Sequence, residues 1–422
     1  MGARRAPELT QTALCYSPRE RTLRHIVLRN ITMTTENRWL LPEGIDELLP
    51  ERAHQLETLR RRLLDQCATW GYRYVIPPLV EFTDSLLIGL GADLDLATCK
   101  FTDRMSGRML GVRADITPQV ARMDAHSLAE EGVTRLCYAG STLQSAPHNV
   151  GSGRAPIQLG AELYGAASIE ADSEIVSLML SIFEAARVQR AVTLDIGHIG
   201  IYDALFSDAA INPQLESEIF DALQRKSMPD IERLLARLPA DVAEKLTKLA
   251  PLHGSPEVIE KARAAFANEA TVLTALDDLA AILHRTRSAF PDIGVYVDLT
   301  ELRGFRYHTG LVFAVYLEGR GSAIAKGGRY DNIGAVFGRD RPATGFAIDL
   351  KALIDDATLD DASAAPVIAP VSDDPALLKA IASLRQAGRT VIVDVAPGVS
   401  LPHAERLVLR DGEWVAEMES GA

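Results

Sequence analysis

Cysteine is scarce in this sequence, and the few cysteines form no pattern. The four residues of this type are far apart, so no C-x-x-C pair occurs; they are Cys15, Cys67, Cys99 and Cys137. A disulfide framework and a cysteine-based zinc site are therefore not expected. Reduced thiols of a cytoplasmic protein are the simpler interpretation.

Other common signatures are missing as well. No run of about 18 apolar residues occurs, so no membrane-spanning helix is expected. The phosphate-binding pattern G-x-x-x-x-G-K-[ST] and the metalloprotease pattern H-E-x-x-H are absent, and no G-x-G-x-x-G stands between a strand and a helix. The histidines are scattered, without the spacing of metal ligands. We therefore expect neither a metal nor a cofactor.

Positive charge is also in short supply. The formal net charge is -13 at pH 7, although apolar residues make up 47% of the chain, as in an ordinary globular protein. Nonspecific binding to nucleic acid depends on Lys and Arg that neutralise phosphates, so this balance disfavours it. The last segment, 366–422, has more Asp and Glu than Lys and Arg, which disfavours contact with tRNA in particular.

Composition divides the chain into several parts. Residues 1–32 are rich in arginine and are expected to be a disordered extension, or to precede a natural start at Met33. Residues 33–354 are expected to form the core. The stretch 205–290 within it is rich in Ala, Leu, Glu and Lys, which indicates a helical insert. An acidic, alanine-rich linker is expected at 355–365, followed by a small α/β unit at 366–422.

Periodicity within the core indicates helices mixed with short strands. Apolar residues recur at helical spacing in 51–70 and 170–188. The pair Gly327-Gly328 is interpreted as a tight turn before a last core strand. Strands are predicted at 72–76, 109–113, 135–140, 156–163, 191–197, 293–299, 310–317 and 343–349.

Four segments together carry a resemblance that no single one could. They are Arg113-Ala-Asp115-Ile-Thr117, Gln158-Leu-Gly160-Ala-Glu162, Leu302-Arg303-Gly304-Phe-Arg-Tyr307-His308 and Gly327-Gly-Arg-Tyr-Asp331. In this order and spacing they resemble the catalytic core of histidyl-tRNA synthetase over roughly residues 40–354. The resemblance implies an α+β fold of the class II aminoacyl-tRNA synthetase type, with an antiparallel sheet flanked by helices.

The resemblance also implies a histidine site. By position, the ammonium group would contact Asp115, Thr117 and Gln158, and the imidazole would contact Glu162. His308, which replaces a tyrosine and follows Tyr307, would lie at the far edge of the ring, and Arg303 would face the carboxylate. A carboxylate suits this task because it accepts hydrogen bonds from N–H groups. The alternative is that these residues are inherited framework, kept for packing and for hydrogen bonds within the sheet.

Two departures from the synthetase pattern concern ATP. The resemblance places two phosphate-binding arginines at positions where this chain has Gln144 and Ala352. Neither residue supplies the permanent charge of a guanidinium. The neighbouring Lys351 is predicted to lie on an extended strand and so to point to the opposite face. Loss of both charges should leave adenylation negligible.

A synthetase-like core without these arginines is similar to the regulatory subunits of short-form ATP phosphoribosyltransferase. That resemblance implies a non-catalytic protein that binds a separate catalytic subunit, acts in the first step of histidine biosynthesis and responds to histidine. The class II core implies a homodimer or larger assembly through about 51–81. Histidine could instead bind at the interface with the catalytic subunit. The rivals are a diverged histidyl-tRNA synthetase or ATP-dependent amino-acid ligase, and a binding module such as a tRNA sensor.

Overall fold

The computed structural model describes most of the chain. The described ranges are 39–88, 92–147, 153–206, 209, 211–301, 307–359, 365–396, 401 and 403–418. The expected extension 1–32, part of the expected linker and the candidate Arg303 lie outside the described residues. Within the described ranges, none of the helices has both the length and the apolar character needed to cross a membrane.

The largest sheet in the described ranges has nine strands in the order β1-β5-β6-β12-β11-β10-β7-β9-β8. Adjacent strands in this sheet run antiparallel, except that β1 is parallel to β5 and β7 is parallel to β9. The α+β class with a mainly antiparallel sheet is thus confirmed. The strands are β1 (Arg73–Tyr74), β5 (Thr134–Ser141), β6 (Ile157–Tyr164), β7 (Val192–His198), β8 (His253–Gly254), β9 (Gly294–Asp298), β10 (Leu311–Leu317), β11 (Ala325–Arg329) and β12 (Ala343–Asp349).

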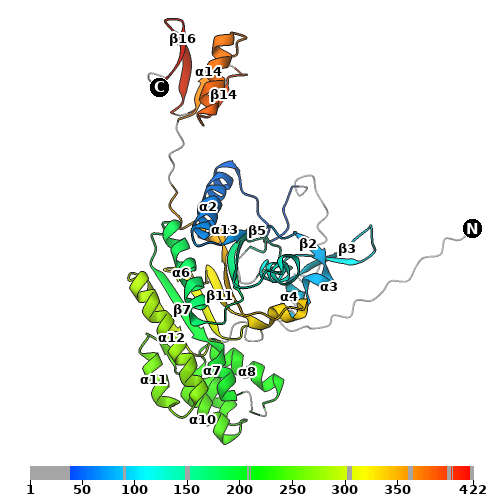
Figure 1. The fold of residues 1–422 in the computed structure, drawn as a ribbon, viewed down its shortest axis with the longest axis vertical. Coiled ribbons are helices and arrows are strands. Elements are labelled where there is room, and N and C mark those ends of the chain that lie inside the picture. The colour runs from blue at the N-terminus through cyan, green and yellow to red at the C-terminus, as the bar shows by residue number, and fades with distance from the viewer. Residues whose placement is uncertain are drawn as a thin grey trace, which may run out of the picture.

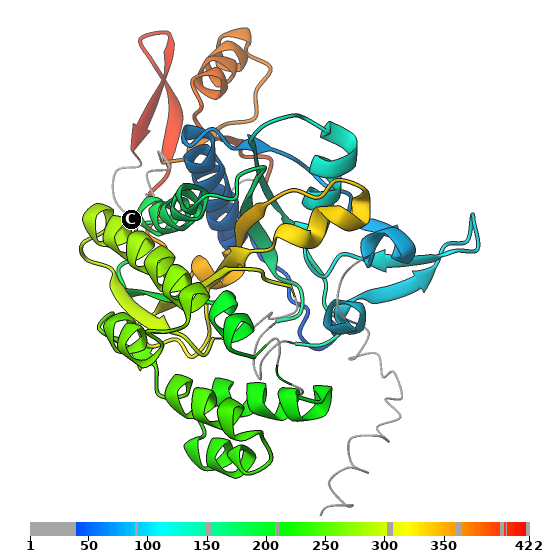
Figure 2. The ribbon, with the colours of Figure 1, turned by 60° about the horizontal axis from the view of Figure 1, so that its bottom comes forward.

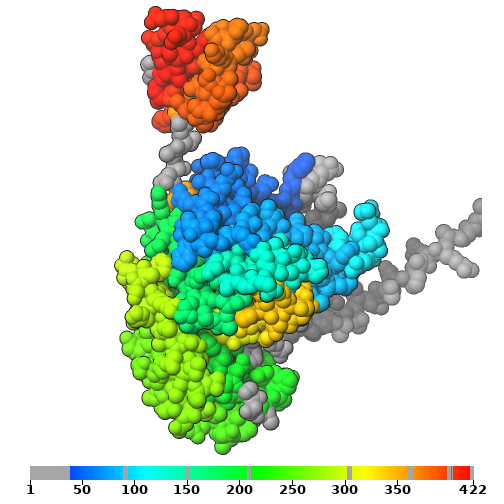
Figure 3. All heavy atoms as spheres, in the orientation of Figure 1, coloured from blue at the N-terminus to red at the C-terminus, as the bar shows by residue number. Residues whose placement is uncertain are grey.

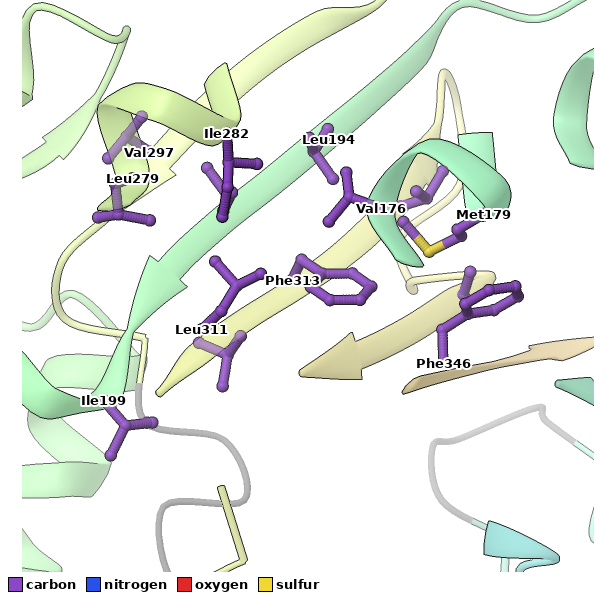
Figure 4. Close-up of a cluster of buried hydrophobic side chains, with 14 of the residues drawn as sticks. Val176, Met179, Leu194, Ile199, Leu279, Ile282, Val297, Leu311, Phe313 and Phe346 are labelled. Carbon is purple, nitrogen blue, oxygen red and sulfur yellow. The ribbon is translucent and has the colours of Figure 1, made fainter. Parts of the chain in front are cut away.

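Helices cover one face of this sheet and form the main core with it (Figure 1). They are α2 (Pro50–Thr69), α6 (Ile169–Ala185), α12 (Ala270–Ala289) and the short α13 (Leu350–Leu353). Both helices predicted from periodicity, at 51–70 and 170–188, are present as α2 and α6. Figure 4 shows side chains of α6 and α12 over the sheet: Val176, Met179, Leu279 and Ile282 face Leu194, Leu311, Phe313 and Phe346.

Further helices lie in the range predicted to be a helical insert. Figure 2 shows them gathered at one end of the sheet. They are α8 (Pro213–Gln224), α9 (Met228–Leu235), α10 (Ala240–Leu249) and α11 (Val258–Ala265), followed by α12; α7 (Ile199–Phe206) comes before them and lies mostly ahead of the predicted range. Asn212 caps α8, because its side chain accepts a hydrogen bond from the backbone N–H of Leu215 at 2.9 Å. Lys226, just past α8, binds the sheet residue Asp298 through its ammonium group.

A smaller sheet, β2-β4-β3, carries a hairpin that projects from the body (Figures 1 and 3). Asp103 closes the hairpin by accepting hydrogen bonds from the backbone N–H groups of Met105 and Ser106. The elements of this region are β2 (Val80–Phe82), α3 (Thr83–Leu86), α4 (Ala92–Ala97), β3 (Cys99–Thr102), β4 (Met109–Val112), α5 (Thr117–Arg122), a π-helical turn (Met123–Leu128) and a 3-10 helix (Asp331–Phe337).

The C-terminal part has its own four-stranded sheet in the order β14-β13-β15-β16 and its own small core. One helix packs on it, and Trp414 donates a hydrogen bond to Asp374 at the start of that helix, at 2.7 Å. The elements are β13 (Val367–Ala369), α14 (Pro375–Gln386), β14 (Val391–Val393), β15 (Glu405–Arg410) and β16 (Glu413–Met418).

One prediction of local structure is wrong. Gly327 and Gly328 do not form a turn but lie inside β11, paired with β10 on one side and β12 on the other. A side chain at 327 would overlap the ring of Phe313 and the carbonyl oxygen of Gly345, and one at 328 would overlap His308. Glycine is required at both positions because neighbouring groups approach the backbone closely. In a sequence, a glycine pair of this kind looks the same as a glycine pair in a turn.

We therefore expect Gly327→Ala to lower the free energy of unfolding by about 1–3 kcal/mol, the usual penalty for overpacking a tight core. The matched control is Gly321→Ala, because a methyl group at 321 meets nothing within 4 Å. That control should change stability by less than about 0.5 kcal/mol. Urea unfolding followed by circular dichroism measures both. Equal stability of the two variants would contradict the packing argument.

Candidate functional site

The centre of the candidate site is the carboxyl group of Glu162 on β6. Side chains alternate along this strand, so Leu159 and Ala161 pack in the helix-covered core while Glu162 faces the other side of the sheet. Glu162 has no exposed surface. Its partner across the sheet is Gly345, where any side chain would overlap the Glu162 carboxyl group. The glycine on β12 thus makes the space that the carboxyl group occupies.

Hydroxyl groups surround this carboxyl group. Tyr138 donates a hydrogen bond to Oε1 of Glu162 at 3.1 Å, and Tyr330 donates to Oε2 at close range. The hydroxyls of Tyr138 and Thr117 are 3.1 Å apart and form a further hydrogen bond. Both oxygens of the buried carboxyl group are therefore satisfied without a cation at hydrogen-bond distance in the described residues.

A second carboxyl group, Asp115, lies nearby and is fixed by backbone and amide groups. Its Oδ1 accepts from the backbone N–H of Thr117 at 3.2 Å. The side-chain oxygen of Gln158 accepts from the N–H of Ile116 at 3.1 Å, which places Gln158 against the same loop. Gln158 therefore orients the loop that carries Asp115, a role that differs from direct contact with an ammonium group.

Aromatic rings close another side of the site. Tyr307 stacks on Tyr330 with ring centres 5.1 Å apart, and His308 meets Tyr307 edge to face at the same distance. The ring of His308 lies over Gly328, which has no side chain to block it. The hydroxyl of Tyr307 is buried and has no hydrogen-bond partner among the described residues. A ligand polar atom at this point would satisfy it.

Burial changes the acidity of both carboxyl groups. The pKa of Glu162 is raised from 4.5 to about 8; desolvation is the largest cause, the surrounding hydroxyls lower the pKa, and the neighbouring Asp115 raises it. Desolvation also raises the pKa of Asp115, against the hydrogen bonds that lower it. Two carboxyl groups with shifted acidity among tyrosines make this a candidate site for a small ligand with nitrogen donors or acceptors.

The positions of the missing phosphate-binding arginines are occupied by uncharged residues in ordinary structural roles. The backbone N–H of Gln144 donates to the carbonyl of Arg154 at 2.8 Å, and Gln144 forms a β-bridge with Thr98. Ala352 lies in α13. The expectation that Lys351 sits on an extended strand is wrong, because 350–353 is helical. Its ammonium group pairs with Asp46 at 2.7 Å.

Arg113 is the remaining arginine of the Arg-Ala-Asp-Ile-Thr segment, and it serves the framework. Its Nε donates to the carbonyl oxygen of Ser141 at 2.8 Å, and a terminal nitrogen donates to that of Pro77 at 2.8 Å. Gly140 leaves room for this guanidinium group, which a side chain at 140 would strike. Arg113 thus ties β5 to the segment after β1.

Six of the residues singled out from sequence lie around one site. They are Asp115, Thr117, Gln158, Glu162, Tyr307 and His308, whereas Arg303 falls outside the described residues. Two residues that bond to Glu162 were missed, Tyr138 and Tyr330. Tyr330 stands inside the quoted Gly-Gly-Arg-Tyr-Asp segment, whereas Tyr138, in β5, lies outside the four quoted segments. Their role depends on reaching Glu162 from other strands, which spacing alone does not reveal.

A separate acidic cluster lies farther along the sheet. The carboxyl oxygens of Asp195, Asp298 and Glu301 are within 4.8 Å of one another. The ammonium group of Lys226 donates to both oxygens of Asp298, at 2.7 and 2.5 Å. The protein thus supplies its own cation to Asp298, and the cluster is explained as the anchor of the insert.

The raised pKa of Glu162 gives a pH dependence of stability with a defined sign. Between pH 4.5 and about 8 the folded chain keeps a proton that the unfolded chain has released. The free energy of unfolding should therefore fall as the pH rises through this window, by at most about 1.4 kcal/mol per pH unit. Glu162→Gln should remove this component, and urea unfolding of both proteins from pH 5 to 8 measures it. If the free energies of unfolding of wild type and Glu162→Gln changed in parallel with pH, Glu162 could not be uncharged in the folded chain.

Comparison with known proteins now places this geometry in a family. The sequence-family model of histidyl-tRNA synthetase matches residues 44–353. The sequence-family model of the C-terminal domain of the ATP phosphoribosyltransferase subunit HisZ matches residues 364–417. The ATP phosphoribosyltransferase regulatory subunit of Thioalkalivibrio sulfidiphilus is 50% identical over 369 residues, which cover 86% of this chain and 93% of the relative.

Two solved structures are similar in fold. A Bacillus halodurans protein described as an ATP phosphoribosyltransferase regulatory subunit/histidyl-tRNA synthetase aligns with a TM-score of 0.74 and 26% identity, over 86% of this chain and 95% of its own. A chain of the ATP phosphoribosyl transferase (HisG:HisZ) complex from Thermotoga maritima aligns with a TM-score of 0.54 and 21% identity, over 72% and 98%. With the 50% identity along most of its length, these matches show that the chain belongs to the family of ATP phosphoribosyltransferase regulatory subunits.

Proposed function

We propose that this chain assembles with the catalytic subunit of ATP phosphoribosyltransferase and makes its activity respond to histidine, which binds at Glu162. The observation that carries the proposal is the pair of carboxyl groups, Glu162 and Asp115, enclosed by tyrosines in a synthetase-like sheet. The two arginines expected for ATP phosphates are absent from the same frame. A site with recognition groups but without phosphate-binding groups favours sensing over catalysis.

The chemistry of the site suits histidine. Asp115 and the hydroxyl of Thr117 offer acceptors for the ammonium group, and Glu162 offers a partner for the imidazole ring. The stacked rings of Tyr307 and Tyr330 offer a flat wall beside it, and His308 closes its edge. By resemblance, Arg303 would meet the carboxylate.

An ATP-dependent ligase is the rival function. It would need positive charge opposite the triphosphate, and removing one such group from a transition state typically costs about 3–4 kcal/mol. Gln144 and Ala352 supply none, and Lys351 is engaged by Asp46. ATP–pyrophosphate exchange dependent on histidine should therefore be at background.

The partner follows from the relatives. The Thermotoga maritima structure is a complex of two kinds of subunit, and its matching chain shares this fold. We propose the same kind of hetero-oligomer here, in the cytoplasm and without tRNA. In support, segment 366–422 carries an acidic excess that would repel the phosphates of tRNA.

Self-association is proposed through the edge of the large sheet. β1 is an edge strand, and the segment around it exposes apolar side chains: Tyr74 is 43% exposed, Ile76 73% and Leu79 50%. Exposed apolar groups beside an unpaired strand edge favour pairing with another chain. A second copy across a two-fold axis would cover this edge in both chains.

Histidine can regulate only if it binds two states with different affinity. Glu162 is sealed by Tyr138 and Tyr330, so a ligand that reaches it must displace a phenol. Tyr330 begins the turn into the 3-10 helix Asp331–Phe337. We propose that this displacement separates the two states, and reciprocity then requires that the state favoured by the substrates binds histidine less tightly.

The catalytic subunit should be activated by this chain and inhibited by histidine in the complex. Glu162→Ala should still activate, because Glu162 has no exposed surface to offer the catalytic subunit, but the histidine concentration for half inhibition should rise at least tenfold. Glu184→Ala, an exposed residue of α6, is the control and should behave as wild type. Enzyme assays with size-exclusion chromatography of each complex measure both effects. Unchanged inhibition in an intact Glu162→Ala complex would exclude this site and favour a subunit interface.

Charge at the sheet edge should weaken the homodimer. Ile76→Asp places a carboxylate on the proposed contact, so dimer dissociation should become at least tenfold easier. Val371→Asp is the control, because Val371 is 66% exposed but lies in the C-terminal unit. Analytical ultracentrifugation over a concentration series measures the effect. A dimer unaffected by Ile76→Asp would contradict this face as the interface.

A further inference from the structure

We infer that Glu162 supplies the proton of the hydrogen bond to imidazole. In the ligand-free chain Glu162 is a neutral acid, and it donates to the unprotonated ring nitrogen of histidine. This inference rests on the proposed function and specifies the ionisation state of the effector. It reverses the arrangement expected from the sequence, in which a carboxylate accepts from a ring N–H.

The contacts of Glu162 favour the neutral acid. The side chain has no exposed surface, and each of its hydrogen-bond partners in the described residues is a hydroxyl. An ionised carboxylate removed from water needs a cation or several strong donors. A phenol can accept as well as donate, so Tyr138 and Tyr330 can also accept the proton of the neutral acid.

The surrounding titratable groups do not favour ionisation. Asp115 adds negative charge and raises the pKa of Glu162. Burial raises the pKa of Tyr138, Tyr164, Tyr307 and Tyr330 well above 10, so these phenols stay neutral; they approach from β5, β6, the segment before β10 and the end of β11. The ring of His308 meets that of Tyr307 edge to face.

The nearby arginines among the described residues are committed elsewhere. Behind Tyr164, Arg341 donates to both oxygens of Asp124, each at 2.9 Å. Arg113, near Tyr138, donates to backbone carbonyls. Arg329 lies on the helix-covered side and pairs with Asp172. Consistent with this arrangement, the pKa of Glu162 is raised to about 8, with burial as the largest cause.

The number of protons held before and after binding predicts how the affinity for histidine depends on pH. The complex holds one proton, shared between Glu162 and the imidazole ring. Below about pH 6.5 free histidine carries an imidazolium proton, which must be released on binding. Above about pH 8 Glu162 has lost its proton, which must be taken up. Affinity should therefore be flat between these values and fall about tenfold per pH unit on either side. With an ordinary Glu, the plateau would lie between about pH 4.3 and 6.5.

The same arrangement defines the ligand class. A neutral acid offers a donor, so it selects an amino acid with a neutral ring nitrogen that can accept. Lysine and arginine carry permanent cations without an acceptor at that position. A site with a neutral Glu162 should therefore exclude lysine and arginine, whereas a site with an ionised Glu162 would bind them.

The test is the dissociation constant of histidine, measured by calorimetry from pH 5.5 to 9 on the full chain. Wild type should show the plateau. Glu162→Gln carries an amide N–H in place of the acid proton, so its affinity at pH 7 should stay within about fivefold and should not fall above pH 8. Glu162→Ala should bind at least a hundredfold more weakly. Glu184→Gln is the matched surface control and should follow wild type.

The inference would be overturned if Glu162→Gln bound histidine as weakly as Glu162→Ala. It would also be overturned if the affinity of wild type for histidine rose steadily below pH 6.5. Infrared difference spectra between ligand-free wild type and Glu162→Gln test the protonation without histidine. A protonated carboxyl band at pH 7 supports the inference, and a carboxylate band overturns it. If wild type shows the protonated band but binds no histidine, the proposed histidine site fails while the neutral Glu162 stands.

Discussion

Removing a carboxyl group from water is unfavourable by several kcal/mol unless its oxygens are hydrogen bonded or its charge is lost. The centre of this molecule meets both conditions around Glu162. Gly345 provides the space, and Tyr138 and Tyr330 provide the hydrogen bonds. Since these residues come from β5, β12 and the end of β11, the register of the sheet must be correct for one carboxyl group to be satisfied.

Two buried arginines hold the strands in that register through ion pairs. Arg329 in β11 pairs with Asp172 of α6 at 2.9 Å and with Asp331 at 2.9 Å, which joins the helix layer to the segment carrying Tyr330. Arg341, just before β12, pairs with Asp124 at 2.9 Å. Removing the buried partner of either arginine would leave an uncompensated buried charge, which typically destabilises a protein by about 3–5 kcal/mol. The position of the Tyr330 hydroxyl is thus set by contacts on both faces of the sheet.

Much of this was predictable from sequence where periodicity is strong. The helices at 51–70 and 170–188 and most core strands follow from the spacing of apolar residues. The four quoted segments were enough to predict the class II fold and to bring Asp115, Gln158 and Glu162 together. The wrong predictions have identifiable physical causes. Lys351 is helical because Asp349 caps α13 by accepting a hydrogen bond from the backbone N–H of Lys351. Gly327-Gly328 were interpreted from their neighbours in sequence, but Phe313 and Gly345, far away in the chain, decide their structure. Tyr138 and Tyr330 were missed for the same reason.

The sealed position of Glu162 also has a kinetic consequence. With no surface exposed, the carboxyl group is reached only after the enclosing tyrosines open, so the association rate of any ligand there is limited by opening rather than by diffusion. The same closure slows departure, which lengthens the residence time of the ligand. A sensor built on this site averages its effector over the lifetime of the closed state and does not follow brief fluctuations in concentration.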